Sequence, residues 1–184
     1  MGASGMRFFV ILAIAFIICG CNGNRTIPTI DSEACLTVSR TDISSDILKA
    51  TGKPIENSHQ MSFVVPAQKD MTDIIVYLEY LWFDMDIKFI NFVNDCQDYA
   101  ELKTKFATLV VKQSTKQPVS PGIFVMYVYQ EHEWGGVGIA PMHAVVLYAI
   151  NDNGTVALRV WEPQNSKTCS ISTYPNTAWK VFVP

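Results

Sequence analysis

The chain has 184 residues, 49% of them hydrophobic and 11% aromatic, with 17 acidic and 14 basic side chains. This length allows one domain, or barely two. The net charge of −3 excludes a dedicated nucleic-acid-binding protein, which would have an excess of basic residues, and the apolar and aromatic content excludes a disordered chain.

The N-terminal 20 residues have the pattern of a signal peptide. An unbroken run of 12 apolar residues, Phe8–Cys19, follows a single basic residue, Arg7. This run is shorter than the roughly 20 residues that a membrane-spanning helix needs. Its end resembles a bacterial lipobox, so we expect residues 1–20 to be removed and Cys21 to become the lipidated N-terminus. Ordinary secretion with cleavage nearby is the alternative.

Removal of residues 1–20 would leave a tether, residues 21–35, followed by one domain, residues 36–184. Arg7 is the only charged residue removed, so the remaining 164 residues carry a net charge of −4. A single acyl anchor adds membrane attachment without adding a membrane domain. We therefore expect a lipoprotein of the bacterial cell envelope, anchored in a membrane by its lipid, with the domain facing the extracytoplasmic side.

Helical patterns dominate the first half of this domain. The predicted elements are a weak helix at Ser44–Ala50, a short strand at Met61–Val65 and helices at Asp70–Trp82 and Asp95–Lys112. In the last of these, Tyr99, Leu102 and Phe106 fall on one helix face, which makes it the strongest helical signal.

Strand patterns dominate the second half. The predicted strands are Ile123–Tyr129, Met142–Ile150, Thr155–Trp161 and Ala178–Val183. Helices first and an antiparallel sheet afterwards is the order of an α+β domain.

Cys96 lies at the start of the strongest helix. A helix N-terminus favours the thiolate form of cysteine, and the thiolate is the nucleophile. The neighbouring carboxylates Asp95 and Asp98 oppose this effect. Taken alone, a cysteine in this position is more often a buried structural residue.

His143 and Glu162 are brought together by either register of the predicted hairpin. If Asn151–Gly154 form a four-residue loop, His143 lies opposite Glu162. If Asn153-Gly154 form a two-residue turn, His143 lies opposite Gln164 and Glu162 is its diagonal neighbour. In both registers the imidazole and the carboxylate share one face of the sheet. A structural hydrogen bond that closes the hairpin is the alternative to a catalytic pair.

Three short motifs carry a resemblance to a known family. The segments Asn94–Ala100, Met142–Val145 and Val160–Gln164 resemble the papain-like cysteine peptidase domain that follows the β-trefoil lectin in certain mushroom agglutinins. The resemblance covers about residues 70–165 and implies a papain-like fold, with N-terminal helices packed on a C-terminal antiparallel β-sheet. It implies a catalytic triad of Cys96, His143 and Glu162. No trefoil domain accompanies it here, so sugar targeting is not implied.

The chemistry of such a triad defines the expected function. The imidazole takes the thiol proton and the carboxylate fixes the imidazole. We expect a membrane-anchored thiol hydrolase, a cysteine peptidase acting on a peptide or protein substrate. Transglutaminase- or amidase-type acyl transfer would use the same three residues, and a non-catalytic interaction lipoprotein is a further alternative. Asn91, five residues before Cys96, is the candidate for an oxyanion-binding side chain.

The last expectations concern the other cysteines and the cofactors. Three cysteines would remain in an oxidising compartment, an odd number. With Cys96 as nucleophile, Cys35 and Cys169 are left to form a disulfide. No cofactor or metal site is expected from the residues, since no CxxC or HExxH spacing supports zinc. The family resemblance implies calcium, with ligands that do not map onto this sequence.

Overall fold

A computed structural model describes residues 26–84, 96–116, 118–134, 136–137 and 140–184. The fold is α+β, as the sequence predicts. The expected signal peptide, the lipidated Cys21 and the oxyanion candidate Asn91 lie outside the described residues.

Three α-helices and two short 3-10 helices are described, together with nine strands. The helices are α2 (Arg40–Thr51), α3 (Gln68–Asp84), α4 (Cys96–Thr115), η1 (Ser32–Ala34) and η2 (Ile171–Thr173). The strands are β1 (Leu36–Ser39), β2 (Ile55–Glu56), β3 (Ser62–Val65), β4 (Ser120–Pro121), β5 (Ile123–Gln130), β6 (Ala140–Asp152), β7 (Thr155–Trp161), β8 (Thr168–Ser170) and β9 (Thr177–Phe182). All eight predicted elements are present, with boundaries within a few residues of those expected.

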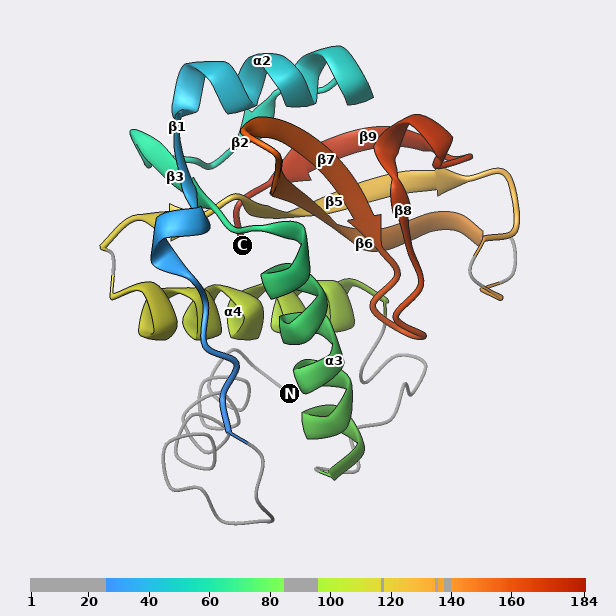
Figure 1. Cartoon of the computed structure of the whole chain (residues 1–184). Helices are drawn as coiled ribbons and strands as arrows, with labels where there is room; N and C mark the ends of the chain where they lie inside the picture. The colour runs from blue at the N-terminus through green and yellow to red at the C-terminus, as the bar shows by residue number, and fades with distance from the viewer. Residues whose placement is uncertain (1–25, 85–95, 117, 135, 138–139) are drawn as a thin grey trace.

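The main sheet has six strands in the order β2-β9-β5-β6-β7-β8. It is antiparallel except for the parallel pairing of the short β2 with β9. A second, three-stranded sheet, β1-β3-β4, includes a parallel pair between β3 and β4. Figure 1 shows α3 and α4 on one face of the main sheet and α2 on the other. The sheets are therefore mixed rather than purely antiparallel, and the helices cover both faces.

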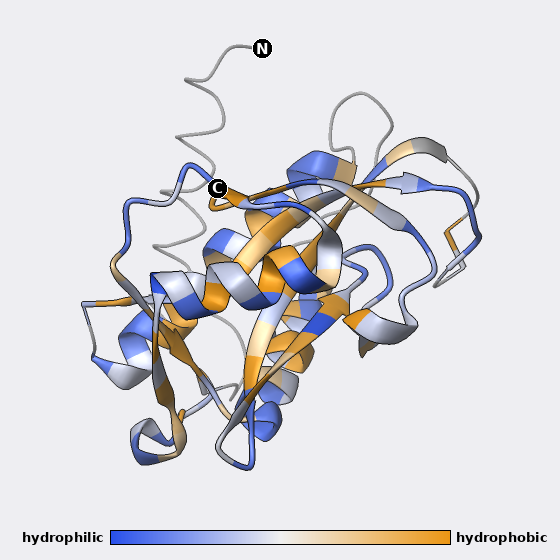
Figure 2. Cartoon of the chain, turned by 90° about the horizontal axis from the view of Figure 1, so that it is seen from above, coloured by the Kyte–Doolittle hydropathy of each residue, from blue (hydrophilic) through white to orange (hydrophobic). Residues whose placement is uncertain are grey.

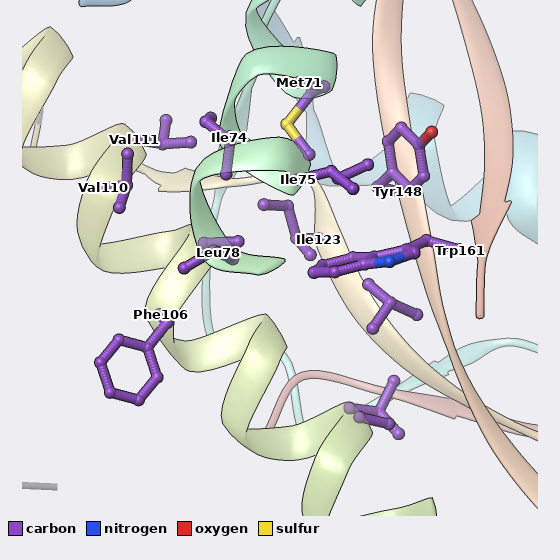
Figure 3. Packing of buried hydrophobic residues seen from close by; sticks show 14 of the residues in the cluster. Met71, Ile74, Ile75, Leu78, Phe106, Val110, Val111, Ile123, Tyr148 and Trp161 are labelled. Carbon is purple, nitrogen blue, oxygen red and sulfur yellow. The ribbon is translucent and has the colours of Figure 1, made fainter. Parts of the chain in front are cut away.

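Alternating residues of the central strands build two hydrophobic clusters, one on each face of the main sheet. On one face, Ala144, Val146 and Trp161 pack with α3 and α4, in the layer that Figure 3 shows at close range. On the other face, Val145 and Leu147 pack with α2. Figure 2 shows α2 with alternating hydrophilic and hydrophobic bands above the hydrophobic strands.

The segment that was expected to form a tether contributes to this core. Residues 21–35 are described from residue 26, and Ile30 is only 4% exposed within the α3–α4 cluster. Burying an isoleucine side chain contributes about 1.5–3 kcal/mol. Ordered packing therefore begins before Cys35.

The β6–β7 hairpin has the shorter of the two predicted turns. Asp152 pairs with Thr155, and Asn153 and Gly154 have φ values of 53° and 88°. These left-handed conformations belong to a two-residue type I′ turn, which suits Asn-Gly. At its other end the ladder stops at the Val146–Trp161 pair, so His143 lies three residues beyond the last pair.

Candidate functional site

Cys96 is the first residue of α4 and is half-buried. The first turn of a helix has backbone N–H groups without partners inside the helix, and these favour an anion at that end. The placement agrees with the expectation from sequence. The acidic residue Asp98 also lies in this first turn and acts in the opposite direction.

His143 and Glu162 form a buried hydrogen-bonded pair. Their Nε2 and Oε2 atoms are 2.7 Å apart, and the two side chains are 3% and 0% exposed. The second carboxylate oxygen, Oε1, accepts a hydrogen bond of 3.1 Å from the Gln164 N–H. Because both carboxylate oxygens have partners, Glu162 tolerates complete burial. The β6–β7 ladder has the register of the two-residue turn, and it ends at Val146–Trp161, one residue before Glu162.

Cys96 completes the candidate triad through a hydrogen bond with the imidazole of His143. Burial opposes protonation of His143, but hydrogen bonds with Cys96 and Glu162 and the negative charge of both outweigh it, so the pKa of His143 is raised from 6.5 to about 9. Glu162 occupies Nε2, which leaves Nδ1 for the thiol. The structure thus brings the three sequence-predicted residues together, from α4, from β6 and from the residue after β7.

Lys103 is a charged neighbour of this group that the sequence analysis did not predict. Its side chain is 1% exposed and forms an ion pair with Glu79 of α3. The ammonium lies 5.6, 5.9 and 5.2 Å from the ring centres of Trp82, Tyr99 and Trp161. The signal in the sequence was a lysine four residues after Tyr99, within the apolar stripe of the helix.

The described part of the loop after β5 packs on the side of the main sheet opposite α4. Trp134 packs edge-to-face against Tyr174, with ring centres 5.0 Å apart, and both contact the α2-side cluster. The His132 N–H donates to Asn176 Oδ1 at 2.8 Å. The charge of Glu162 acts on Tyr174, whose pKa is raised mainly by burial. The described part of this loop is therefore held against residues 174–176, between η2 and β9.

The expected disulfide between Cys35 and Cys169 is wrong. Cys35, Cys96 and Cys169 are all free thiols in the structure. Cys35 packs against the α3–α4 cluster and Cys169 against the α2-side cluster, so they contact opposite faces of the main sheet. Burial raises the pKa of Cys35 to about 11 and raises that of Cys169. Both thiols are protonated at neutral pH.

A separate hollow of about 400 Å³ lies between α3 and the segment that leads into β8. It is lined by Thr72, Ile75, Val76, Glu79, Tyr80, Tyr148, Ser166 and Thr168. None of the three candidate catalytic residues lines it. Its link to the site is Glu79, the partner of Lys103.

The described residues offer no ligand set for the calcium that the family resemblance implies. No group of three or more His, Cys, Asp or Glu side chains among them is placed to hold a metal ion. Within the same residues, no helix has the length and apolar character needed to cross a membrane.

The comparisons with known proteins show the fold. No protein-family model and no curated protein matches the chain. Among solved structures, the crystal structure of Polyporus squamosus lectin with the human-type influenza-binding epitope Neu5Aca2-6Galb1-4GlcNAc is similar, with a TM-score of 0.58 and 12% identity over 80% of this chain and 50% of the lectin chain. A structure described as a PSL1a–E64 complex has a TM-score of 0.55 and 11% identity over 80% and 51%.

The chain thus spans about half the length of the solved structures that it matches. At identities of 11–12% the similarity establishes the fold alone. The chain shares the fold of that half of the mushroom lectin. This is the part of the expected family resemblance that the comparisons support.

Proposed function

We propose that the protein is a cysteine hydrolase that cleaves peptide bonds, with Cys96 as nucleophile, His143 as acid–base and Glu162 as the orienting carboxylate. The observation that carries the proposal is the linked set of contacts from Glu162 through His143 to Cys96. A thiol, an imidazole and a carboxylate in that order are the components of nucleophilic acyl transfer. The PSL1a–E64 description of one structural neighbour gives secondary support, since E64 is an epoxide that alkylates reactive thiols.

The proposed reaction follows from the ionisation of the pair. With a pKa of about 9, His143 is an imidazolium at neutral pH when it is paired with the Cys96 thiolate. The thiolate attacks the substrate carbonyl, and N–H groups at the start of α4 stabilise the oxyanion. The imidazolium gives its proton to the leaving amine as the C–N bond breaks. Water, deprotonated by the now neutral imidazole, then hydrolyses the thioester and restores the thiolate.

Two parts of the proposal rest on residues outside the described ranges. Asn91 would supply a side-chain donor to the oxyanion, and Cys21 would carry the lipid that attaches the enzyme to the extracytoplasmic side of the envelope. The lipobox pattern at residues 18–21 supports the anchor. Membrane fractions of cells producing the full chain should contain it, and Cys21→Ser should release it to the soluble fraction. Equal membrane association of both forms would contradict lipid anchoring.

The decisive experiment measures casein hydrolysis and E-64 labelling of the full chain. Cys96→Ala should abolish both, whereas the matched control Cys169→Ala, which removes a half-buried thiol outside the candidate triad, should retain both. Hydrolysis that survives Cys96→Ala would refute the proposal. Amine incorporation into casein, or cleavage of peptidoglycan fragments in place of casein, would identify acyl transfer or amidase chemistry at the same residues.

A further inference from the structure

The buried Lys103 needs an explanation beyond its ion pair. Lysine is almost never fully buried, because removing its charge from water is costly even when it is paired. Lys103 is 1% exposed, whereas its partner Glu79 is 34% exposed. An apolar residue would fill the same space between α3 and α4 without that penalty. A function for the charge itself would account for the lysine.

Stabilising the net charge of the candidate site would be such a function. As thiolate, imidazolium and carboxylate, the three candidate residues carry a net charge of −1, at a place where His143 and Glu162 are almost completely buried. A net negative charge is unfavourable in such an environment. Lys103 is seven residues after Cys96 on α4, and its ammonium lies over the ring of Trp161, the residue that precedes Glu162.

We propose that Lys103 is a positioning residue of the candidate active site, whose buried ammonium favours the ionised form of Cys96, His143 and Glu162. The inference rests on the proposed function, because it concerns the same three residues. Lys103 acts through Glu162 and does not touch substrate. Glu79 lies partly in water, so its opposing charge is screened more strongly than that of the buried Glu162.

Among the described residues, two other titratable groups, Tyr99 and Tyr174, lie near these charges. Burial lowers the pKa of Lys103, and contacts with Glu79 and the charge of Glu162 oppose this lowering. On the same helix, burial raises the pKa of Tyr99. Beside Glu162, burial raises the pKa of Tyr174. Both phenols therefore stay uncharged at and below neutral pH.

A merely structural role for Lys103 predicts a different result from the proposed one. If the ion pair with Glu79 only holds α3 against α4, its removal lowers stability and leaves the reactivity of folded Cys96 unchanged. If the ammonium favours the ionised site, its removal slows the reaction of Cys96 with an alkylating reagent at acid pH. The effect should vanish at high pH, where ionisation of a cysteine thiol no longer needs a cation nearby.

The experiment compares rate constants for iodoacetamide alkylation of Cys96 at pH 6 and pH 9.5, with the modified residue identified by peptide mass spectrometry. Lys103→Met should slow alkylation at pH 6 about tenfold, which corresponds to about one pKa unit for a charge at this range. At pH 9.5 the two rates should agree. Lys103→Arg should restore most of the rate. Lys105→Met removes a 38% exposed lysine from the same helix and should behave as wild type.

Two results would overturn the inference. One is equal alkylation at pH 6 by folded Lys103→Met and wild type. The other is equal alkylation by the double variant Lys103→Met/Glu79→Gln, which leaves no unpaired buried charge and serves if the single variant does not fold. An inert Cys96 in the wild-type protein would instead refute the proposed function itself.

Discussion

Replacing Glu162 with glutamine tests the candidate triad most sharply, because it removes the charge and keeps the size. The carboxylate makes two contacts, 2.7 Å to His143 Nε2 and 3.1 Å to the Gln164 N–H, and its side chain is fully buried. A glutamine has only one oxygen to offer. While His143 is an imidazolium, the glutamine NH₂ group faces one of two donors, so Glu162→Gln leaves a donor unsatisfied until His143 loses its Nε2 proton.

The expected size of the effect follows from these contacts. A hydrogen bond to a charged group contributes about 1.5–3 kcal/mol, which corresponds to roughly 10–150-fold in an equilibrium. The pKa of His143, about 9 in the wild type, depends on Cys96 and Glu162 acting against burial. With the carboxylate gone and burial unchanged, we expect the pKa of His143 to fall by about two units. A pKa near 7 leaves about half of His143 protonated at pH 7, so alkylation of Cys96 at that pH should slow about twofold.

The assay is a titration of the histidine side chains by NMR, in wild type and in Glu162→Gln. The chain has three histidines, and the exposed His59 and His132 serve as internal reference signals. The reasoning is refuted if His143 titrates at the same pH in both proteins, or if it titrates close to 6.5 in the wild type.

Three further predictions follow from the same structure. Because the pKa of His143 is raised to about 9 from 6.5, its stabilising contribution is complete below about pH 6.5 and is lost as pH rises through 9. Urea unfolding should therefore show a fall of up to about 3 kcal/mol across that range, which His143→Asn removes. Iodoacetamide at pH 7 should label Cys96 faster than Cys35, whose pKa is about 11, and faster labelling of Cys35 would contradict the site. Leu78→Ala, at a fully buried core position, should cost about 2–5 kcal/mol of unfolding free energy, whereas Val76→Ala, 47% exposed on the same helix, should change it by less than about 0.5.

The helices and strands were predictable where a hydrophobic pattern extends over many residues. The helices α3 and α4 and the strands β5, β6, β7 and β9 all have patterns of six residues or more. The strands β1, β2, β4 and β8, which were not predicted, have two to four residues and form through pairing with other segments. The start of α2 was also missed. Ser39 caps this helix by accepting from the Asp42 N–H at 3.1 Å, a Ser-x-x-Asp signal that lies before the predicted start at Ser44.

The candidate site was predictable because each of its three residues lies in or next to an element with a clear sequence pattern, namely α4, β6 and β7. Cys96 begins the best helix, and either hairpin turn brings Glu162 to His143. Which turn is present depends on the left-handed conformation of Asn153 and Gly154, and sequence spacing alone left two choices. The disulfide prediction failed because a count of cysteines does not show which face of the sheet each cysteine contacts. Cys35 and Cys169 contact opposite sides of the main sheet.

The end of the β6–β7 ladder explains how this fold accommodates a fully buried carboxylate. Trp161 makes the last ladder pair, so the backbone of Glu162 is not bonded to β6. Instead its N–H donates to Lys167 O and its C=O accepts from Ser166 N–H, both at 2.8 Å. The turn formed by residues 162–167 thus satisfies the Glu162 backbone, and the Gln164 N–H within it binds the carboxylate.

This turn therefore holds the carboxylate that is hydrogen-bonded to the imidazole, through contacts that do not include Cys96. The orientation of His143 is set by β6 and the turn, while the thiol is delivered by a different element, α4. Substitutions that disturb the turn should thus change the His143–Glu162 pair without moving Cys96. Substitutions at the start of α4 should leave that pair intact. The division assigns the geometry of the proposed acid–base pair to the sheet and the placement of the proposed nucleophile to the helix, and each can be perturbed separately.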